Sequence, residues 1–141
     1  MGRISEQERI FLRLREELQY KSPYYQQLPF EVVRLTRGQA VLRFTIAPHF
    51  VNAAGKASGG VLAAFCDSLM GITGRTLGDQ VTTLEINMNY ICPVPAGSVL
   101  VGIGTVIHEG AKTIVVECEF LNEHKEIVVK GRSSFYILQK F

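Results

Sequence analysis

Apolar and polar residues alternate with a helical period at the start of the chain. Ser5 stands three residues before Glu8, which is the spacing of a capping box at a helix start. Apolar side chains then recur at helical spacing, at Ile10, Phe11, Leu14 and Leu18. The pattern predicts an amphipathic helix over about 5–20, with an outer face rich in Arg and Glu.

A second segment with helical character spans 59–77 and is far more apolar. Its sequence, GGVLAAFCDSLMGITGRTL, is long enough for a helix, rich in Leu and Ala, and charged only at Asp67 and Arg75. A helix that is apolar around most of its surface is usually buried in a protein core. We therefore predict a long central helix over about 59–77.

The rest of the chain has the two-residue period of strands. Strand-like alternation covers 31–46, with a turn at Arg37-Gly38, and continues in four runs at 81–91, 98–110, 112–122 and 126–138. Short turn sequences separate several of these runs, and strands joined by tight turns pair antiparallel. The order predicts an α+β fold in which one antiparallel sheet wraps around the central helix.

Composition narrows the class of protein. The 141 residues fit a single domain, 1–141, and a net charge of +2 gives no reason to expect nucleic acid or an acidic membrane surface as a partner. The first residues lack the apolar core of a signal peptide, and no run approaches the length of a membrane span. Three scattered cysteines and three scattered histidines suggest buried thiols, no metal site and a cytoplasmic protein.

Candidate chemistry lies at the start and in the middle of the central helix. Gly59 and Gly60 open the helix, where free backbone N–H groups can hold an oxyanion, and Asp67 follows two turns later. Small residues and this carboxylate share one helix stripe, which consists of Gly60, Ala64, Asp67, Gly71 and Gly74. The stripe would admit a second subunit or a substrate. Alternatively, Asp67 pairs with Arg75 or caps nearby backbone.

The spacing of these residues resembles a known family. The pattern N-x5-S-G-G-x6-D, which runs from Asn52 to Asp67, is similar to the N-x5-H-G-G-x6-D/E motif of the PaaI-like branch of the hotdog-fold thioesterases. The resemblance covers roughly 35–138 and includes the segment TLEINMNYICPVPAG at 83–97. It implies a hotdog fold and an acyl-CoA thioesterase that needs no cofactor.

The resemblance also implies roles for individual residues. Backbone N–H groups of Gly59 or Gly60 would polarise the thioester carbonyl, while Asp67 from the facing subunit would activate water or attack directly. Thr83 would orient that water, and Asn52 would lie near the thioester. Members of this branch form dimers or tetramers with active sites between subunits. An aromatic acyl group or a short or medium aliphatic one would suit a pocket lined by Phe, Leu and Met.

Ser58 departs from the family pattern, which usually has His at this position. A hydroxyl still donates one hydrogen bond but carries no positive charge. This difference leaves open a relative that binds acyl-CoA or an acyl-lipid without turnover, and a purely structural oligomer is the third possibility. Candidates for contacts with the CoA phosphates are Lys56, Arg75, Lys112, Lys130 and Arg132.

Overall fold

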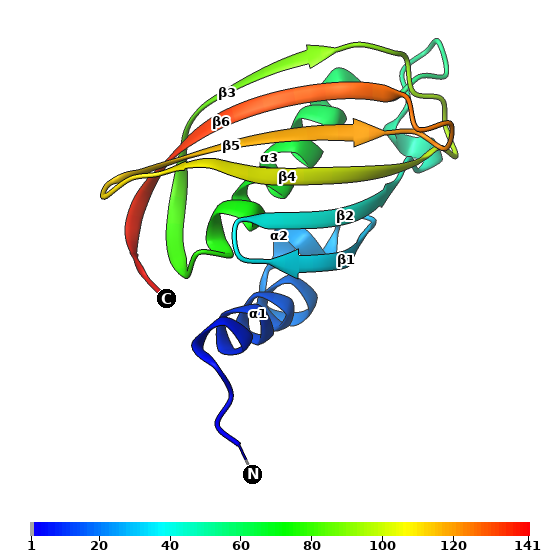
Figure 1. Cartoon of the computed structure of the whole chain (residues 1–141). Coiled ribbons are helices and arrows are strands. Elements are labelled where there is room, and N and C mark those ends of the chain that lie inside the picture. The colour runs from blue at the N-terminus through cyan, green and yellow to red at the C-terminus, as the bar shows by residue number, and fades with distance from the viewer. Residues whose placement is uncertain (1) are drawn as a thin grey trace.

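A six-stranded antiparallel sheet forms the body of the protein. The computed structural model describes residues 2–141, and its strands follow the order β1-β2-β4-β5-β6-β3 across the sheet (Figure 1). Their bounds are β1 Phe30–Thr36, β2 Gln39–Thr45, β3 Asp79–Tyr90, β4 Val99–Glu109, β5 Thr113–Leu121 and β6 Ile127–Lys140. Every neighbouring pair is antiparallel, as the turns in the sequence predict. Strand β3 lies at one edge of this sheet.

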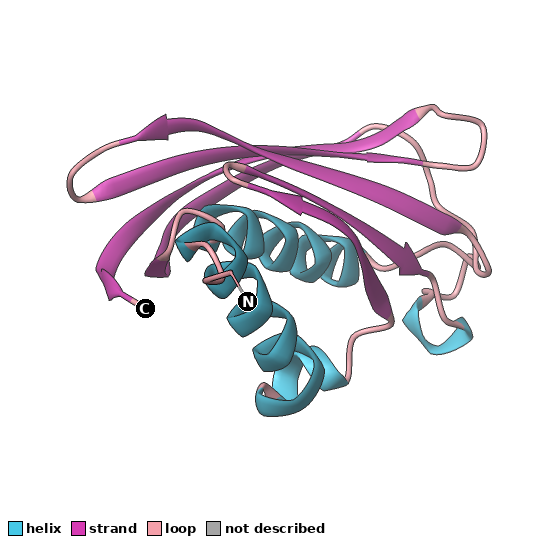
Figure 2. Cartoon of the chain, turned by 60° about the horizontal axis from the view of Figure 1, so that its bottom comes forward, coloured by secondary structure: helices cyan, strands magenta, loops and turns pink. Residues whose placement is uncertain are grey.

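The sheet curves around the long helix α3, Gly59–Arg75 (Figures 1 and 2). The alternating burial of β5 places one face of this strand against the helix and leaves its other face more open. Large side chains fill the layer between them; for example, the rings of Phe44 and Phe65 stack with centroids 4.4 Å apart. The predicted central helix is confirmed, and its last two predicted residues form the turn that leads into β3.

One contact between α3 and β4 is closer than an ordinary side chain allows. A Cβ atom at Gly104 would lie 2.1 Å from Oγ1 of Thr73, and Thr73 is itself held by a 2.7 Å hydrogen bond to the carbonyl of Leu69. Glycine at this point lets the helix approach the sheet.

The N-terminal segment packs on the same side of the sheet as α3 (Figure 2). Helix α1, Glu6–Glu16, begins with the predicted capping box, and the chain continues through a wider helical turn, Glu17–Lys21, into the short helix α2, Pro23–Gln26. The buried side chains of Ile10 and Leu14 attach α1 to the core. No helix in residues 2–141 is both long and apolar enough to cross a membrane.

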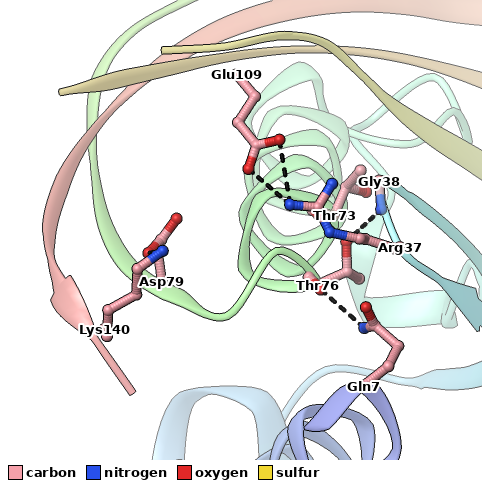
Figure 3. A network of polar contacts seen from close by, with 8 residues as sticks. All are labelled: Gln7, Arg37, Gly38, Thr73, Thr76, Asp79, Glu109 and Lys140. Carbon is pink, nitrogen blue, oxygen red and sulfur yellow. Dashed lines mark hydrogen bonds and ion pairs between the residues drawn. The ribbon is translucent and has the colours of Figure 1, made fainter. Parts of the chain in front are cut away.

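Polar contacts hold the C-terminal end of α3 in place (Figure 3). The Thr76 hydroxyl accepts a hydrogen bond from the backbone N–H of Gly38 at 2.9 Å, and the Thr76 carbonyl accepts one from the Gln7 side chain at 3.1 Å. Nearby, the buried carboxylate of Asp79 lies 2.9 Å from the ammonium of Lys140. The helix end is thus joined to the β1–β2 turn and to α1.

Candidate active site

Asp67 lies halfway along α3 on the side of the helix that faces β3. Its Oδ1 accepts a hydrogen bond of 3.0 Å from the hydroxyl of Thr83. Both residues line an open groove of about 310 Å³ beside the helix. Arg75 is paired with Glu17 instead of Asp67, so the alternative of an Asp67–Arg75 ion pair is wrong. The aspartate carboxylate therefore faces open space with a hydroxyl as its bonded neighbour.

A β-bulge in β3 directs Thr83 toward the helix. The pairing of β3 with β6 shifts register between Thr83 and Glu85, so Leu84 is the extra residue. Val81 and Thr83 line the groove, whereas beyond the bulge Asn87 and Asn89 line the opposite face of the sheet. The extra residue inverts the alternation of side chains along the strand, a common use of bulges next to functional sites.

Tyr90, at the far end of β3, binds the start of α3. Its hydroxyl donates a 2.7 Å hydrogen bond to the carbonyl of Gly59, and its ring packs over that glycine. Sequence reasoning did not select Tyr90, although it lies within the motif segment 83–97. The sequence shows an aromatic residue near the end of a predicted strand. Which face of the sheet carries its side chain depends on the bulge.

The two glycines at the start of α3 leave open space. Neither has a left-handed φ, and a Cβ at Gly59 or Gly60 would meet no atom closer than 3.5 Å. Folding of this chain therefore does not demand glycine at either position. No hydrogen bond among the described residues uses the N–H groups of these two glycines. Both N–H groups are available to a ligand.

Ser58 and Asn52 flank this helix start in different ways. Ser58 is the N-cap residue, but its hydroxyl makes no capping hydrogen bond. The Asn52 side-chain oxygen accepts hydrogen bonds from the N–H groups of Ala54 and Lys56, at 3.0 and 3.2 Å. That oxygen shapes the loop, so only the Asn52 amide N–H groups are left to point at a ligand.

Some of the predicted site residues lie apart from one another within one chain. Asp67 follows Gly60 by seven positions, which corresponds to about 10 Å along the helix axis. Asp67 therefore does not meet the glycine amides of its own chain. In addition, a Cβ at Gly74 would contact Val116 and Ile114 of β5, so Gly74 faces the sheet and does not belong to the open stripe.

Two candidate phosphate-binding residues lie on the other face of the sheet. Lys130 pairs with Glu119 and Arg132 with Glu117, beside a groove of about 610 Å³. This groove is larger than the one at Asp67, but neither Asp67 nor Thr83 lines it. Arg75 is occupied by Glu17, whereas Lys56 is exposed in the loop before α3.

Comparison with known proteins identifies the family. Residues 54–129 match the thioesterase superfamily, and the chain belongs to it. The fold is the hotdog fold: the structure of the Escherichia coli PaaI protein superimposes with a TM-score of 0.88, at 18% identity, over 94% of this chain and 96% of that one. The curated E. coli acyl-coenzyme A thioesterase PaaI is 23% identical over 75% of this chain and 77% of its own length.

Two further relatives extend the comparison. A putative esterase from Saccharolobus solfataricus is 29% identical over 79% of this chain and 81% of its own length. A hypothetical thioesterase from Streptococcus pneumoniae, solved with coenzyme A, is 25% identical, with a TM-score of 0.77 over 79% of this chain and 90% of that one. The matched range 54–129 contains Ser58, Gly59, Gly60, Asp67 and Thr83 but not the N-terminal helical segment.

Proposed function

We propose that this protein hydrolyses acyl-CoA thioesters to a free acid and CoA, with Asp67 as the catalytic carboxylate. The observation that carries the proposal is the hydrogen bond between Asp67 and Thr83 within an open groove on the helix face. Membership of the thioesterase superfamily supports the reaction class. The relative named as an acyl-coenzyme A thioesterase, and the one solved with coenzyme A, support the substrate class.

The proposed reaction uses each group for one task. Asp67 takes a proton from a water held by Thr83, and the resulting hydroxide attacks the thioester carbonyl carbon. N–H groups of Gly59 or Gly60 stabilise the negative charge on the carbonyl oxygen, with Ser58 and Asn52 as further donors nearby. The C–S bond then breaks, and the thiolate of CoA takes up the proton that Asp67 removed from water, which restores the Asp67 carboxylate. In the alternative mechanism, Asp67 attacks the thioester carbonyl carbon directly and the thiolate of CoA leaves. Water then hydrolyses the resulting anhydride between Asp67 and the acyl group.

The proposed site is assembled from two copies of the chain. The glycine amides of one chain are too far from its own Asp67 to act on the same carbonyl. Strand β3 presents an edge of 12 residues, with Leu84 and Tyr90 more than half exposed, and unpaired edges of this kind favour pairing with another strand. Pairing of two β3 edges by a twofold axis gives a dimer, which is the smallest assembly that the proposal requires; two dimers could form a tetramer.

The first test measures release of thiol from a panel of acyl-CoA substrates. Replacement of Asp67 by Asn keeps the shape of the side chain but removes the base, and should lower kcat by at least about a hundredfold. Glu31→Gln is the matched control, because this carboxylate is exposed on β1 and pairs with Arg43 outside the groove. Full activity of the Asp67→Asn protein would remove Asp67 from the mechanism.

A second test addresses the shared site. Asp67→Asn removes the base, and Gly60→Val keeps the backbone N–H but fills the open space beside it, where the thioester carbonyl would bind, so each protein should be impaired alone. The two proteins are co-expressed so that mixed dimers form. A mixed dimer contains one site with both groups intact, so the mixture should recover about a quarter of the wild-type activity. No recovery, in a sample shown to contain mixed dimers, would contradict a site built from two chains.

Ser58 supports the alternative function, a protein that binds acyl-CoA without turnover. The family His is absent at this position, and the Ser58 hydroxyl is not engaged as a helix cap. This alternative predicts measurable affinity for acyl-CoA, with no thiol released above background. Turnover that depends on Asp67 would exclude it.

A further inference from the structure

The groove at Asp67 continues along α3 to a polar end. Asp67, Gly71 and Arg75 follow one another at intervals of four residues, so they lie on one helix face. Asp67 and Arg75 are thus about 12 Å apart along the helix axis. An acyl chain whose thioester lies at Asp67 would run toward Arg75.

The N-terminal segment supplies the wall at this far end. Glu17 and Tyr25, which precede the range matched by the thioesterase superfamily, line the groove together with Arg75. Arg75 is held in place from two sides: its guanidinium pairs with Glu17, and it lies over the ring of Phe141 at 5.4 Å. The side chain of Arg75 is only 12% exposed. The end of the groove is therefore built and fixed before an acyl group enters.

The chemistry of this end disfavours two kinds of acyl tail. An alkyl tail would remove water from the Arg75–Glu17 pair and give no hydrogen bond in return, which costs free energy. The lining groups carry more negative than positive charge, because Glu17 and Asp67 face only one cation, Arg75. At the far end that cation is already paired with Glu17, so a carboxylate tail would find no free positive charge and would lie beside the like charge of Glu17, which disfavours it.

Tyr25 provides a group that can bind a third kind of tail, one that ends in an uncharged hydroxyl. Burial raises the pKa of Tyr25, so its phenol keeps its proton. Tyr25 lines the groove, and its hydroxyl makes no hydrogen bond to any other described residue. It can donate to, or accept from, an uncharged hydroxyl on a ligand.

We propose that the end of the groove formed by Tyr25, Glu17 and Arg75 binds an uncharged hydroxyl at the far end of the acyl group, and so determines which thioesters are hydrolysed. The inference rests on the proposed thioesterase function. The distance of about 12 Å between Asp67 and Arg75 corresponds to about ten extended chain atoms, which fits an acyl group of about eight carbon atoms between the thioester sulfur and a terminal hydroxyl oxygen.

The test compares kcat/KM for octanoyl-CoA, 8-hydroxyoctanoyl-CoA and octanedioyl-CoA. The hydroxylated ester should be preferred over octanoyl-CoA by about three- to tenfold, the value of one partly exposed hydrogen bond. The diacid ester should be the poorest substrate. Butanoyl-CoA and 3-hydroxybutanoyl-CoA, whose hydroxyl lies too close to the thioester, should not differ in this way.

Two variants separate the contributions of the lining residues. Tyr25→Phe should bring the ratio of kcat/KM for the hydroxylated C8 ester to that for octanoyl-CoA close to one. Tyr24→Phe is its control, because Tyr24 is exposed outside the groove. Glu17→Gln removes one negative charge and should raise the relative rate for the diacid by about tenfold. Glu16→Gln is its control, because Glu16 pairs with Lys21 outside the groove.

The outcomes distinguish this inference from the proposed function. If no CoA ester is hydrolysed, the thioesterase proposal fails and the inference fails with it. If all three C8 esters are hydrolysed at similar rates, or Tyr25→Phe leaves their ratios unchanged, the inference alone is overturned.

Discussion

The hydroxyl of Thr83 donates a hydrogen bond to Oδ1 of Asp67 over 3.0 Å, and this bond joins the edge strand β3 to the middle of α3. A hydrogen bond to a carboxylate stabilises one orientation of that group, and the same hydroxyl can hold a water beside it. Thr83→Val keeps the shape of the side chain but removes the donor. We expect kcat to fall by about tenfold, the value of a hydrogen bond to a charged group.

Two further variants complete this first prediction. Thr83→Ser retains the hydroxyl and should retain most of the activity. Thr82→Val, on the neighbouring exposed residue, should have no effect on kcat. Steady-state thiol release gives the rates. Equal losses in the Val and Ser variants would show that the methyl group of Thr83, and not its hydroxyl, is what activity requires.

The second prediction concerns the edge of β3. Leu84 is 56% exposed at the bulge in this strand, where the proposed dimer would bury it. Leu84→Lys places a charge in that contact, so the protein should become monomeric and lose activity together. Leu12, on α1, is also 56% exposed, and Leu12→Lys is therefore a matched control. Light scattering coupled to size-exclusion chromatography reports the assembly. A monomeric Leu84→Lys protein with full activity would contradict the shared site.

Much of the fold follows from the alternation of apolar residues, but the details of the site do not. Ile114, Val116, Cys118 and Phe120 alternate in the sequence, and the structure buries all four. Strict alternation, however, would have put Thr83 and Tyr90 on opposite faces of β3. The bulge at Leu84 brings both to the helix side, and nothing in the order of residues there requires an extra one.

The polar end of the groove was also beyond sequence reasoning, for a different reason. In the sequence, Glu17 belongs to a helical pattern that indicates only a packed N-terminal element, and Arg75 is a candidate partner of Asp67 or of the CoA phosphates. Their contact depends on how the N-terminal segment packs near the end of α3, 58 residues away along the chain. Such a long-range arrangement is decided by packing and not by local spacing.

The third prediction tests the close approach of α3 and β4. Gly104→Ala would force a methyl group against Thr73, whose hydroxyl is held by the Leu69 carbonyl. We expect the free energy of unfolding to fall by about 1–3 kcal/mol, the usual cost of overpacking. Gly59→Ala is the control, because its added Cβ would lie 3.5 Å from Tyr90, an ordinary contact.

A double-mutant cycle identifies the cause of that loss. Removal of the Thr73 hydroxyl in Thr73→Ala should make Gly104→Ala less costly than it is in the wild type, because the nearest clashing atom is gone. Urea denaturation of the four proteins supplies the free energies. Strictly additive losses would show that the strain arises elsewhere in the strand.

The last prediction concerns pH and the ion pair between Lys140 and Asp79 (Figure 3). Hydrogen bonding to the Asp79 carboxylate, together with its charge, raises the pKa of Lys140 above the ordinary value of 10.5. A raised lysine pKa means that the folded protein holds this proton more tightly than the unfolded chain does. The stabilisation is therefore fully present below the ordinary pKa and disappears as the pH rises through the raised pKa of the folded protein.

Lys140→Met should accordingly lower the free energy of unfolding at about pH 9, where it leaves the buried Asp79 carboxylate without its partner. At about pH 11.5 the wild-type lysine has begun to lose its charge, so the difference between the two proteins should shrink. Lys112→Met, in the β4–β5 hairpin, is the control, because Lys112 forms no ion pair within residues 2–141 and its substitution should have little effect at either pH. Denaturant titrations at both pH values provide the comparison. If the effect of Lys140→Met were equally large at both, its charge would not be the source of the stabilisation, and packing of the lysine side chain against β3 would be the remaining cause.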